Sequence, residues 1–494
     1  MALTLHTPQR PIAPTRKAHQ TRIEHDCIGS AEIPAEAYWG IHTLRAIDNF
    51  PVSGITVSDH PELIRAYAQV KQACARANGE LSNINAYQAA LIDRACEDVA
   101  SGELNDQFPV DVLQGGAGTS TNMNMNEVIA NRALELGHHA RGEYDIIHPN
   151  DTVNKSQSTN DTYPAACRLA LIGASGMLVD RTSQLVDAFH TLSERTMPIV
   201  KIGRTQLQDA VPMTFGQEFG GFASQLDADA RLLSSQQTPL AVVNLGGTAI
   251  GTGICADARF RERAIRHLAA LTDLPIRAAD DSVGATSDVG DFVTLSGAIK
   301  RTALHLGKIA NDLRLLASGP RAGFEEIHLP ARQAGSSIMP GKVNPVIPEC
   351  VNQCVFMIMG MDATISCAAE AGQLQLNAFE PVMLHALLTG MHTLANAMDT
   401  LREHCVNGIT VNEQAGMDEV MRSSSLATAL IGYIGYERAM TIAQEALARN
   451  TTVREIAQKE KVLSPELLDS ILDPHNLTHM HCMPTGAMHG CLKK

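Results

Sequence analysis

Apolar side chains recur at every third or fourth position along the middle half of the chain. The clearest run spans residues 288–318, and its stripe, in which only Thr302 is polar, comprises Phe292, Leu295, Ile299, Thr302, Leu306, Ile309, Leu313 and Leu316. Such spacing predicts a long helix packed against near-parallel neighbours. Similar apolar runs cover 165–197, 214–237, 346–372 and 378–404. Together these runs predict a helix bundle.

Shorter periodic runs predict further helices on either side of the bundle, at 60–79, 86–101, 121–137, 425–449 and 464–472. The chain between 102 and 164 is rich in Gly, Asn, Thr, Asp and Pro, and we interpret this part as active-site loops rather than a linker. We therefore expect an all-α fold with four segments: a disordered tail (1–20), an N-terminal domain (21–160), a central helix bundle (161–412) and a small C-terminal helical domain (413–494).

Composition agrees with a helical fold and narrows the partners. Only 4% of residues are aromatic, and Ala, Leu and Met dominate the apolar set, which favours helix over strand. The net charge of −14 argues against nucleic acid and anionic membranes as partners, since both require basic surface. The bundle helices are weakly polar and rich in Gly and Ala, so a second face is expected to be buried by oligomerisation.

Cysteine usage and the ends of the chain indicate a cytoplasmic protein. The eleven cysteines are odd in number and form no paired framework, as expected of free thiols. We find no apolar signal region within residues 1–20 and no uncharged apolar run of 18 residues. The His- and Cys-containing tail after Asp473 fits no defined zinc spacing, so we expect a disordered end and no metal site.

Four polar clusters, far apart in the sequence, have the composition of one binding site: 115–124, 157–161, 203–209 and 335–345. They are rich in hydroxyl and amide groups but contain few charges apart from Arg204 and Lys342. A carboxylate has two acceptor oxygens and binds several such donors. Each cluster alone also fits a turn or a helix cap, and Ser158, Thr159 and Asn160 fit a cap for the helix that follows. These interpretations are compatible, because a helix N-terminus favours an anion.

The fourth cluster reads Gly335-Ser336-Ser337-Ile338-Met339-Pro340-Gly341-Lys342-Val343-Asn344-Pro345. Its Gly and Pro content predicts a loop, and polar loops on a rigid frame commonly carry function. No GxSxG elbow, HExxH motif or paired CxxC occurs in the chain. Because these hydrolase and metalloenzyme motifs are absent, we expect a mechanism of proton abstraction in which hydrogen bonds stabilise the developing charge.

The loop matches the pattern G-S-S-x-x-P-x-K-x-N, and with the other clusters the chain resembles the aspartase/fumarase superfamily from about residue 22 to 478. The resemblance implies an all-α, three-part fold whose long bundle forms the core of a homotetramer. It further implies active sites shared by three subunits. The implied reaction is the reversible elimination of ammonia from L-aspartate to give fumarate, without a cofactor.

Residue roles follow from the same resemblance. Ser336 resembles the catalytic base, and its alkoxide needs stabilisation by backbone N–H groups of the loop. The remaining roles are binding roles: Lys342, Asn344 and Thr205 for the α-carboxylate; Thr119, Ser158 and Thr159 for the carboxylate that accumulates charge as an aci-carboxylate; Asn160 and Gln206 for the amino group; and Ser337 as an additional donor.

Class II fumarases share most of these motifs and are the nearest alternative. They typically carry Thr-His where this chain has Thr205-Gln206, and Ser-Ser-Asn where it has Ser158-Thr159-Asn160. Both departures favour an aspartase, although some aspartases carry His at the position of Gln206. A catalytically silent structural protein is the third alternative, and the intact loop argues against it.

Overall fold

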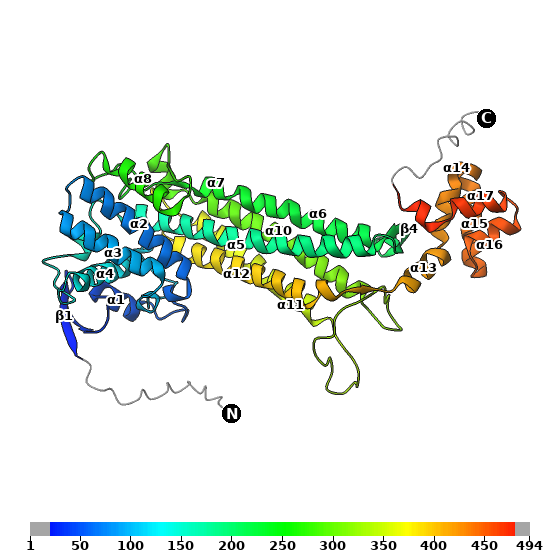
Figure 1. Ribbon diagram of the computed structural model, residues 1–494, viewed down its shortest axis with the longest axis horizontal. Coiled ribbons are helices and arrows are strands. Elements are labelled where there is room, and N and C mark those ends of the chain that lie inside the picture. Colours follow the sequence, from blue (N-terminus) through cyan, green and yellow to red (C-terminus); the bar gives the residue numbers. More distant parts are fainter. Residues whose placement is uncertain (1–19, 480–494) are drawn as a thin grey trace, which may run out of the picture. The chain divides into compact units, whose positions relative to one another are not determined.

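The computed structural model describes residues 20–479 and is mostly helical (Figure 1). Its α-helices are α1 Ile41–Asn49, α2 Pro61–Glu80, α3 Ala86–Ser101, α4 Thr119–Leu136, α5 Thr159–Thr196, α6 Phe215–Ser235, α7 Gln237–Leu240, α8 Phe260–Thr272, α9 Ser282–Ser287, α10 Gly290–Leu316, α11 Val346–Glu370, α12 Glu380–His404, α13 Glu413–Arg422, α14 Ile431–Ile434, α15 Tyr436–Arg449, α16 Val453–Lys459 and α17 Pro465–Ile471. Apart from Gln20, the tail expected at 1–20 lies outside the described residues, as does the chain end after His479.

The long helices confirm the five predicted runs. All eight positions of the stripe on α10 are buried, from Phe292 to Leu316. α5 begins at Thr159, earlier than the apolar run predicts, because the polar segment before residue 165 already forms its first turn. Period and burial thus agree for the bundle.

Between residues 20 and 479, eight short strands accompany the helices, all in two-stranded sheets. They are β1 Thr21–Asp26, β2 Gly29–Pro34, β3 Val200–Thr205, β4 Gln208–Thr214, β5 Val242–Val243, β6 Arg277–Ala278, β7 Ile327–His328 and β8 Thr410–Val411. β1–β2 and β3–β4 are antiparallel hairpins that the helical periodicity did not predict.

One predicted helix is interrupted. The run 425–449 contains a 3₁₀ segment (Ser424–Leu430), then α14, then α15. Gly435 separates the two α-helices with a φ of 78°, a left-handed conformation that glycine adopts without strain. The hydrophobic period continues through this break, which is why the sequence alone predicted a single helix.

The described chain divides into two compact units. Unit 1 contains residues up to Ala174, Gln237–Val293 and Thr364–Leu388; unit 2 contains Ser175–Gln236, Thr294–Ala363 and the chain from Thr389 onward. In unit 1, α2 packs against α3 and α8. In unit 2, Thr182 of α5 donates to Met398 of α12, and Asp229 of α6 forms an ion pair with Arg301 of α10 at 3.0 Å. The C-terminal helices of unit 2 enclose an apolar cluster that includes Leu430, Ile442 and Leu468.

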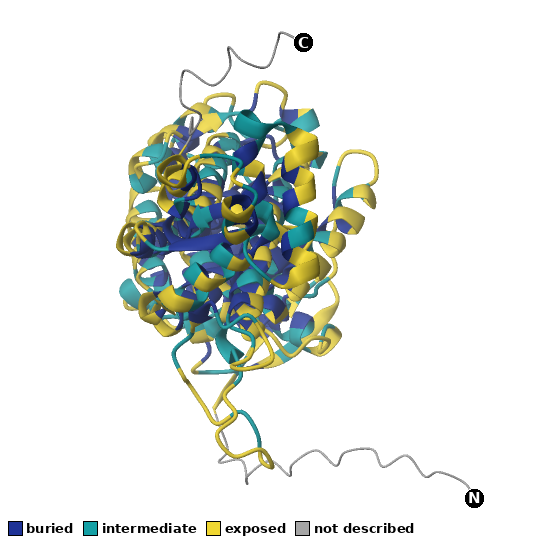
Figure 2. Ribbon diagram, turned by 90° about the vertical axis from the view of Figure 1, so that its right-hand side faces the viewer, coloured by how far each residue is buried: buried dark blue, intermediate teal, exposed yellow. Residues whose placement is uncertain are grey.

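Helix α11 carries large apolar side chains on its surface. Phe356, Met357 and Met359 are 65%, 57% and 44% exposed, and Figure 2 shows the mixture of buried and exposed residues along the helices. By length and composition alone, α5 and α11 would each be able to cross a membrane. The most apolar 18-residue stretch of α5 is 78% buried within the protein, however, and that of α11 is 28% buried. Buried core helices pass the same test.

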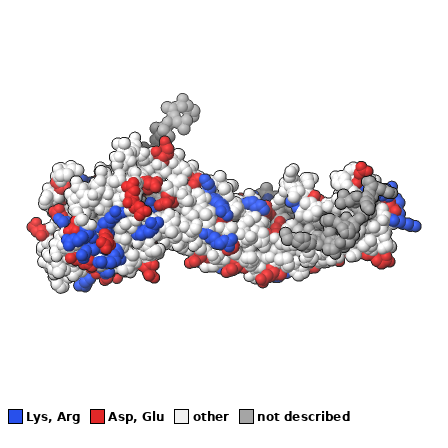
Figure 3. Space-filling view, turned by 90° about the horizontal axis from the view of Figure 1, so that it is seen from above, with Lys and Arg blue, Asp and Glu red and all other residues white. Residues whose placement is uncertain are grey.

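Charged side chains of both signs intermingle on the face shown in Figure 3. On α8, Arg263 and Arg266 contact the carboxylate of Glu80 at 2.8 Å, and just before this helix Arg259 pairs with Asp257 at 2.9 Å. These basic side chains are thus partly neutralised by acidic neighbours.

Candidate active site

The first group of predicted site residues lies in unit 1, where α4 begins. Gly116, Ala117 and Gly118 all adopt positive φ, and the hydroxyl of Thr119 donates to the carbonyl of Gly116 at 2.7 Å. A methyl group at Gly118 would approach the ring of Tyr163 to 2.6 Å. Glycine at this position therefore lets the start of α4 lie against α5.

Ser158, Thr159 and Asn160 form the start of α5. The Ser158 hydroxyl oxygen accepts a hydrogen bond from the Asn160 N–H at 3.2 Å, as a helix cap does. The Asn160 side chain donates through Nδ2 to the carbonyl of Ala249 at 2.8 Å, which leaves Oδ1 as an acceptor. The first turn of this 38-residue helix also has a positive dipole end that favours an anion.

Asp161 anchors this helix start to the loop after β5. Its carboxylate accepts hydrogen bonds from the backbone N–H groups of Ser158, Gly246 and Thr248, each at 3.0 Å. Burial raises the pKa of Asp161 to about 6, against the opposing effect of these three donors. The carboxylate therefore fixes the backbone next to Thr159.

Asn122 joins the two helix starts. Its Nδ2 donates to the hydroxyl oxygen of Thr159 at 3.0 Å, and its Oδ1 accepts from the ammonium of Lys71 at 2.7 Å. Thr119, Ser158, Thr159 and Asn160 are thereby brought onto two adjoining helix N-termini of unit 1.

The second group lies in unit 2, at the tip of the β3–β4 hairpin. Gln206 and Leu207 connect the strands with φ of 53° and 62°. Two positive φ values fit the right-handed twist of a hairpin but usually require Asn or Gly. A left-handed residue other than glycine costs about 1–2 kcal/mol. The strained turn exposes Thr205 and Gln206.

A buried charge cluster holds the base of this hairpin. Arg204 binds Glu326 and contacts Glu419 of α13 at 2.9 Å, and Lys201 contacts Glu326 at 2.8 Å. Burial, reinforced by the hydrogen bond with Glu326, raises the pKa of Glu419 to about 7. Lys201 keeps the pKa of Glu326 below its usual value despite burial. Arg204 therefore ties the strand before Thr205 to two other segments.

The third group is the loop before α11, also in unit 2. In Figure 1 this loop extends away from the helices. The Ser336 hydroxyl oxygen accepts hydrogen bonds from the N–H groups of Ile338 at 3.2 Å and Met339 at 3.0 Å. Gly335 donates to the carbonyl of Lys342 at 2.8 Å and accepts from Asn344 Nδ2 at 2.9 Å. These bonds close the loop at its base, while Ser337 and Lys342 remain exposed.

A cavity of about 510 Å³ borders this loop, and Lys342 and Asn344 line it together with Arg314 of α10. Arg314 donates to Asn352 at 3.1 Å. Two cations and an amide around one hollow provide donors that suit a carboxylate.

The structure brings predicted residues together at the two helix starts of unit 1, whereas those of unit 2 lie in two groups, the hairpin tip and the loop before α11. Thr119 and Ser158–Asn160 belong to unit 1, whereas Thr205, Gln206 and the loop with Ser336, Ser337, Lys342 and Asn344 belong to unit 2.

Sequence reasoning singled out no role for Lys71, Asn122, Asp161 or Arg314. Asn122 and Asp161 stood inside the polar clusters, so their neighbours were a signal. Lys71 and Arg314 stood in amphipathic helices, where a charged residue is usually solvent-exposed.

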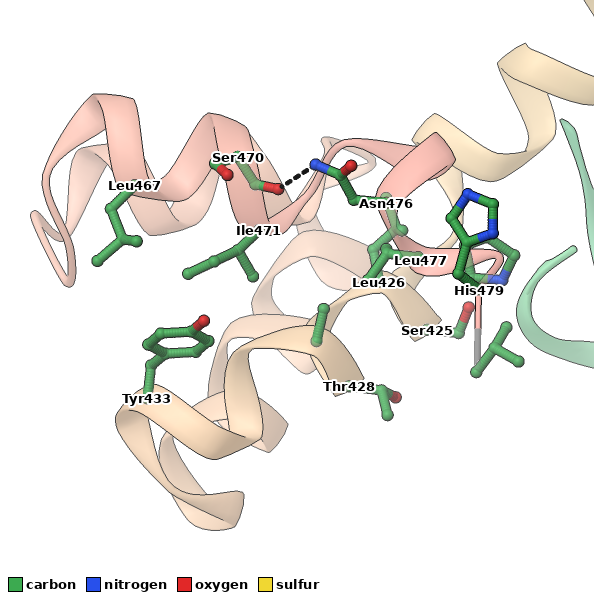
Figure 4. A pocket seen from close by; sticks show the side chains of 13 residues that line it. Ser425, Leu426, Thr428, Tyr433, Leu467, Ser470, Ile471, Asn476, Leu477 and His479 are labelled. Atoms are coloured by element: carbon green, nitrogen blue, oxygen red, sulfur yellow. Dashed lines mark hydrogen bonds between the residues drawn. The ribbon is translucent and has the colours of Figure 1, made fainter. Parts of the chain in front are cut away.

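A second cavity, of about 680 Å³, lies among the C-terminal helices of unit 2 and contains none of the predicted site residues. Figure 4 shows Tyr433, Leu467 and Ile471 along its wall, and the Asn476 side chain donates to the Ser470 carbonyl at 3.1 Å. Within residues 20–479, no cluster of three or more His, Cys, Asp or Glu side chains is arranged to hold a metal ion.

Known proteins similar to this chain are described as lyases or fumarases. A family described as lyase matches residues 29–360, and one described as fumarase C C-terminus matches residues 426–479. The chain is 52% identical to an aspartate ammonia-lyase of Pseudomonas canavaninivorans over 94% of this chain and 98% of the relative. It is 48% identical to the aspartate ammonia-lyase of Escherichia coli K12 over 94% of this chain and 97% of that protein.

Solved structures show the same fold. A fumarate lyase:delta crystallin from Brucella melitensis, bound to cobalt, superposes with a TM-score of 0.91 at 50% identity, covering 93% of this chain and all of the other. The class II fumarase of Schistosoma mansoni superposes with a TM-score of 0.90 at 34% identity, covering 94% of this chain and all of the other. The lyase family covers residues 29–360 and the aspartate ammonia-lyases nearly the whole chain, so the chain belongs to the aspartase/fumarase superfamily of lyases.

Proposed function

We propose that this chain is an aspartate ammonia-lyase, which eliminates ammonia from L-aspartate to give fumarate and catalyses the reverse addition. Relatives that share about 50% sequence identity with this chain, aligned over nearly their full length, are named aspartate ammonia-lyase. The proposed reaction uses no cofactor and takes place in the cytoplasm. Its difficult step is removal of a proton from the carbon next to a carboxylate that is already negative.

The observation that carries the proposed mechanism is that two backbone N–H groups donate hydrogen bonds to the hydroxyl oxygen of Ser336. Ile338 and Met339 donate to its hydroxyl oxygen at 3.2 and 3.0 Å. Donors that face an oxygen stabilise the negative charge that develops on it, so they favour the alkoxide that abstracts the proton. The same bonds would also suit an ordinary serine turn, which the Ser336→Ala variant in the Discussion tests.

The other polar groups divide between the two ends of the substrate. Lys342, Asn344 and Thr205 bind the α-carboxylate, and Ser337 adds a donor. The hydroxyls of Ser158 and Thr159, and that of Thr119 once it releases the Gly116 carbonyl, bind the carboxylate that takes up charge as an aci-carboxylate. Removing one donor to such charge typically costs about 3 kcal/mol of transition-state stabilisation.

The choice between ammonia and water depends on the amino-group side of the site. Gln206 presents an amide carbonyl at the exposed hairpin tip, and Asn160 Oδ1 is an acceptor because its Nδ2 is engaged by Ala249. Two carbonyl acceptors fit the three hydrogens of an ammonium group better than a hydroxyl. We therefore favour aspartate over malate.

The test is the ultraviolet absorbance of fumarate during incubation with L-aspartate and, separately, with L-malate. A rise with aspartate alone supports the proposal. A rise with malate alone identifies a fumarase, and no rise with either identifies a structural protein.

We further propose a homotetramer whose active sites are each shared by three subunits. The exposed apolar face of α11, with Phe356, Met357 and Met359, supports burial against other copies, because exposed apolar surface of this kind is otherwise rare on a monomer. The division of the predicted residues between two units also fits a shared site. We also propose that the chain has three domains, with boundaries at residues 160 and 412.

Subunit complementation tests the shared site. Thr159→Val and Ser336→Ala should each be inactive alone. If the two residues come from different subunits, random mixing of equal amounts leaves both intact in about a quarter of the sites of a closed tetramer. Recovery of about a quarter of wild-type activity after subunit exchange supports the proposal. Zero recovery, with mixed tetramers confirmed by native mass spectrometry, contradicts it.

A further inference from the structure

Lys71 lies in the core of unit 1 with its side chain fully buried. Its ammonium donates to three amide carbonyls: Asn122 Oδ1 at 2.7 Å, Asn154 Oδ1 at 2.9 Å and Gln157 Oε1 at 2.9 Å. An ammonium has three hydrogens, so all of them are used. Among the described residues, no carboxylate forms an ion pair with Lys71 within 4.0 Å, and the buried carboxylate of Asp161 attracts it only from a greater distance.

A buried cation without a carboxylate in direct contact is costly. Burial lowers the pKa of Lys71 to about 8, which reflects that cost. For packing alone, an apolar side chain of the same length would serve better. The three amides therefore point to a role for the charge in orienting them.

The orientation of the Asn122 amide follows from its neighbours. Its Oδ1 accepts from Lys71 and from the hydroxyl of Tyr67 at 2.8 Å. Turning the amide over would place its NH₂ group against the ammonium, where two donors would face each other. Nδ2 must therefore point the other way, toward Thr159 Oγ1 at 3.0 Å and Asn154 Oδ1 at 3.2 Å.

The orientation of the Asn122 amide determines where the Thr159 hydroxyl proton can point. Its hydroxyl oxygen accepts the hydrogen bond from Asn122, so the hydroxyl proton cannot point toward Asn122 and is free to donate elsewhere. Thr159 opens α5, in the polar group on the two helix starts, where the proposed carboxylate would lie. A donor whose own oxygen is hydrogen-bonded to a polarised amide is also a stronger donor.

We propose that Lys71 and Asn122 are positioning residues for the elimination: they lock the Thr159 hydroxyl as a donor to the substrate carboxylate that accumulates charge. Tyr67 supports the same orientation. The inference rests on the proposed function, which assigns that carboxylate to Thr159. Neither Lys71 nor Asn122 contacts the substrate in this proposal.

The decisive variant is Asn122→Asp. The new carboxylate keeps the contacts with Lys71 and Tyr67 and adds an ion pair, so the core should remain folded. It has no N–H for Thr159, however, and the Thr159 proton would turn inward to donate to it. We expect kcat on L-aspartate to fall about 100-fold, the effect of losing one donor to developing charge, with KM changed less than threefold.

Asn126→Asp is the matched control. Asn126 is also fully buried on α4, one turn further along, and donates to Asn154 at 3.1 Å without touching Thr159. The same amide-to-carboxylate change there should alter kcat less than fivefold. A loss as large as that of Asn122→Asp would show a general effect of buried charge and overturn the inference.

Two inhibitors separate positioning from a structural role. Succinate resembles the ground state, whereas the nitronate form of 3-nitropropionate places extra negative charge where the aci-carboxylate forms. In Asn122→Asp, binding of the nitronate should weaken about 100-fold and binding of succinate less than threefold. Equal weakening of both would overturn the inference.

Tyr67→Phe provides a second variant in case Asn122→Asp does not assemble. It removes one of the two donors on Asn122 Oδ1, so the nitronate should weaken more than succinate, but by less than tenfold. An unchanged ratio of the two inhibitors would overturn the inference. If the wild-type chain does not release fumarate from aspartate, the proposed function fails instead, so the two failures are distinguishable.

Discussion

Substitution of Gly118 by alanine should separate the two helix starts of unit 1. Gly118 precedes α4 with a φ of 88°. The added methyl group would lie 2.6 Å from the ring of Tyr163, which is 2% exposed and cannot swing away into solvent. Either the loop or α5 must shift, and with it the spacing between Thr119 and Thr159.

Two costs add up at this position. A left-handed alanine costs about 1–2 kcal/mol relative to glycine. Overpacking a fixed aromatic ring costs about 1–3 kcal/mol. The folded protein should therefore lose roughly 2–5 kcal/mol of stability, and a displacement of about 1 Å between binding groups should reduce kcat/KM by roughly 100-fold.

Initial rates of fumarate release from L-aspartate and the thermal midpoint would be measured in parallel. Gly115→Ala, in the same loop, is the control, since a methyl group there meets the ring of Phe50 at an ordinary 3.5 Å and Gly115 is not among the residues with positive φ. The control should keep its rate within threefold of wild type. If Gly118→Ala matches the control in both rate and midpoint, the close approach of α4 to α5 does not matter for this site, and our reasoning is wrong.

Three further outcomes follow from the same geometry. Ser336→Ala should abolish fumarate release while size-exclusion chromatography shows an unchanged assembly; near-normal turnover would remove Ser336 as the base. Lys342→Ala should raise KM for aspartate and the inhibition constant of fumarate by roughly 100-fold, as expected for loss of a charge-assisted contact, and an unchanged KM would contradict its carboxylate role. Glu419→Gln should stabilise the protein at neutral and alkaline pH. Burial and the neighbouring Glu326 raise the pKa of Glu419 in the fold to about 7, so the stabilisation from its neutral form is complete below the usual glutamate range and is lost as pH rises through 7. Thermal midpoints of variant and wild type should therefore coincide in acid and diverge above neutrality, and parallel curves would refute this account.

Much of this protein could be predicted from local sequence because the deciding interactions are local. The stripe from Phe292 to Leu316 defines the buried face of α10 by its period alone, whatever packs against it. Gly335, Pro340 and Gly341 exclude helix and strand in the loop that carries Ser336. The polar character of the segments around Thr119 and Thr159 was likewise visible residue by residue.

The arrangement of these segments in space could not be predicted from local sequence. The β3–β4 hairpin lacks the Asn-Gly signal of its turn, because Gln206 and Leu207 occupy strained conformations that only the folded surroundings stabilise. Lys71 resembles a solvated helix residue in the sequence, and only the approach of Asn122, 51 positions later, makes it a buried cation with amide partners.

The sequence by itself determined the helical elements, the loop of the proposed base and the kinds of donor at the site. Each of these depends on side-chain type and spacing within a few residues. Tertiary structure alone decided which hydroxyl faces which amide, since the direction of a hydrogen bond depends on every donor and acceptor that long-range packing brings within about 3 Å.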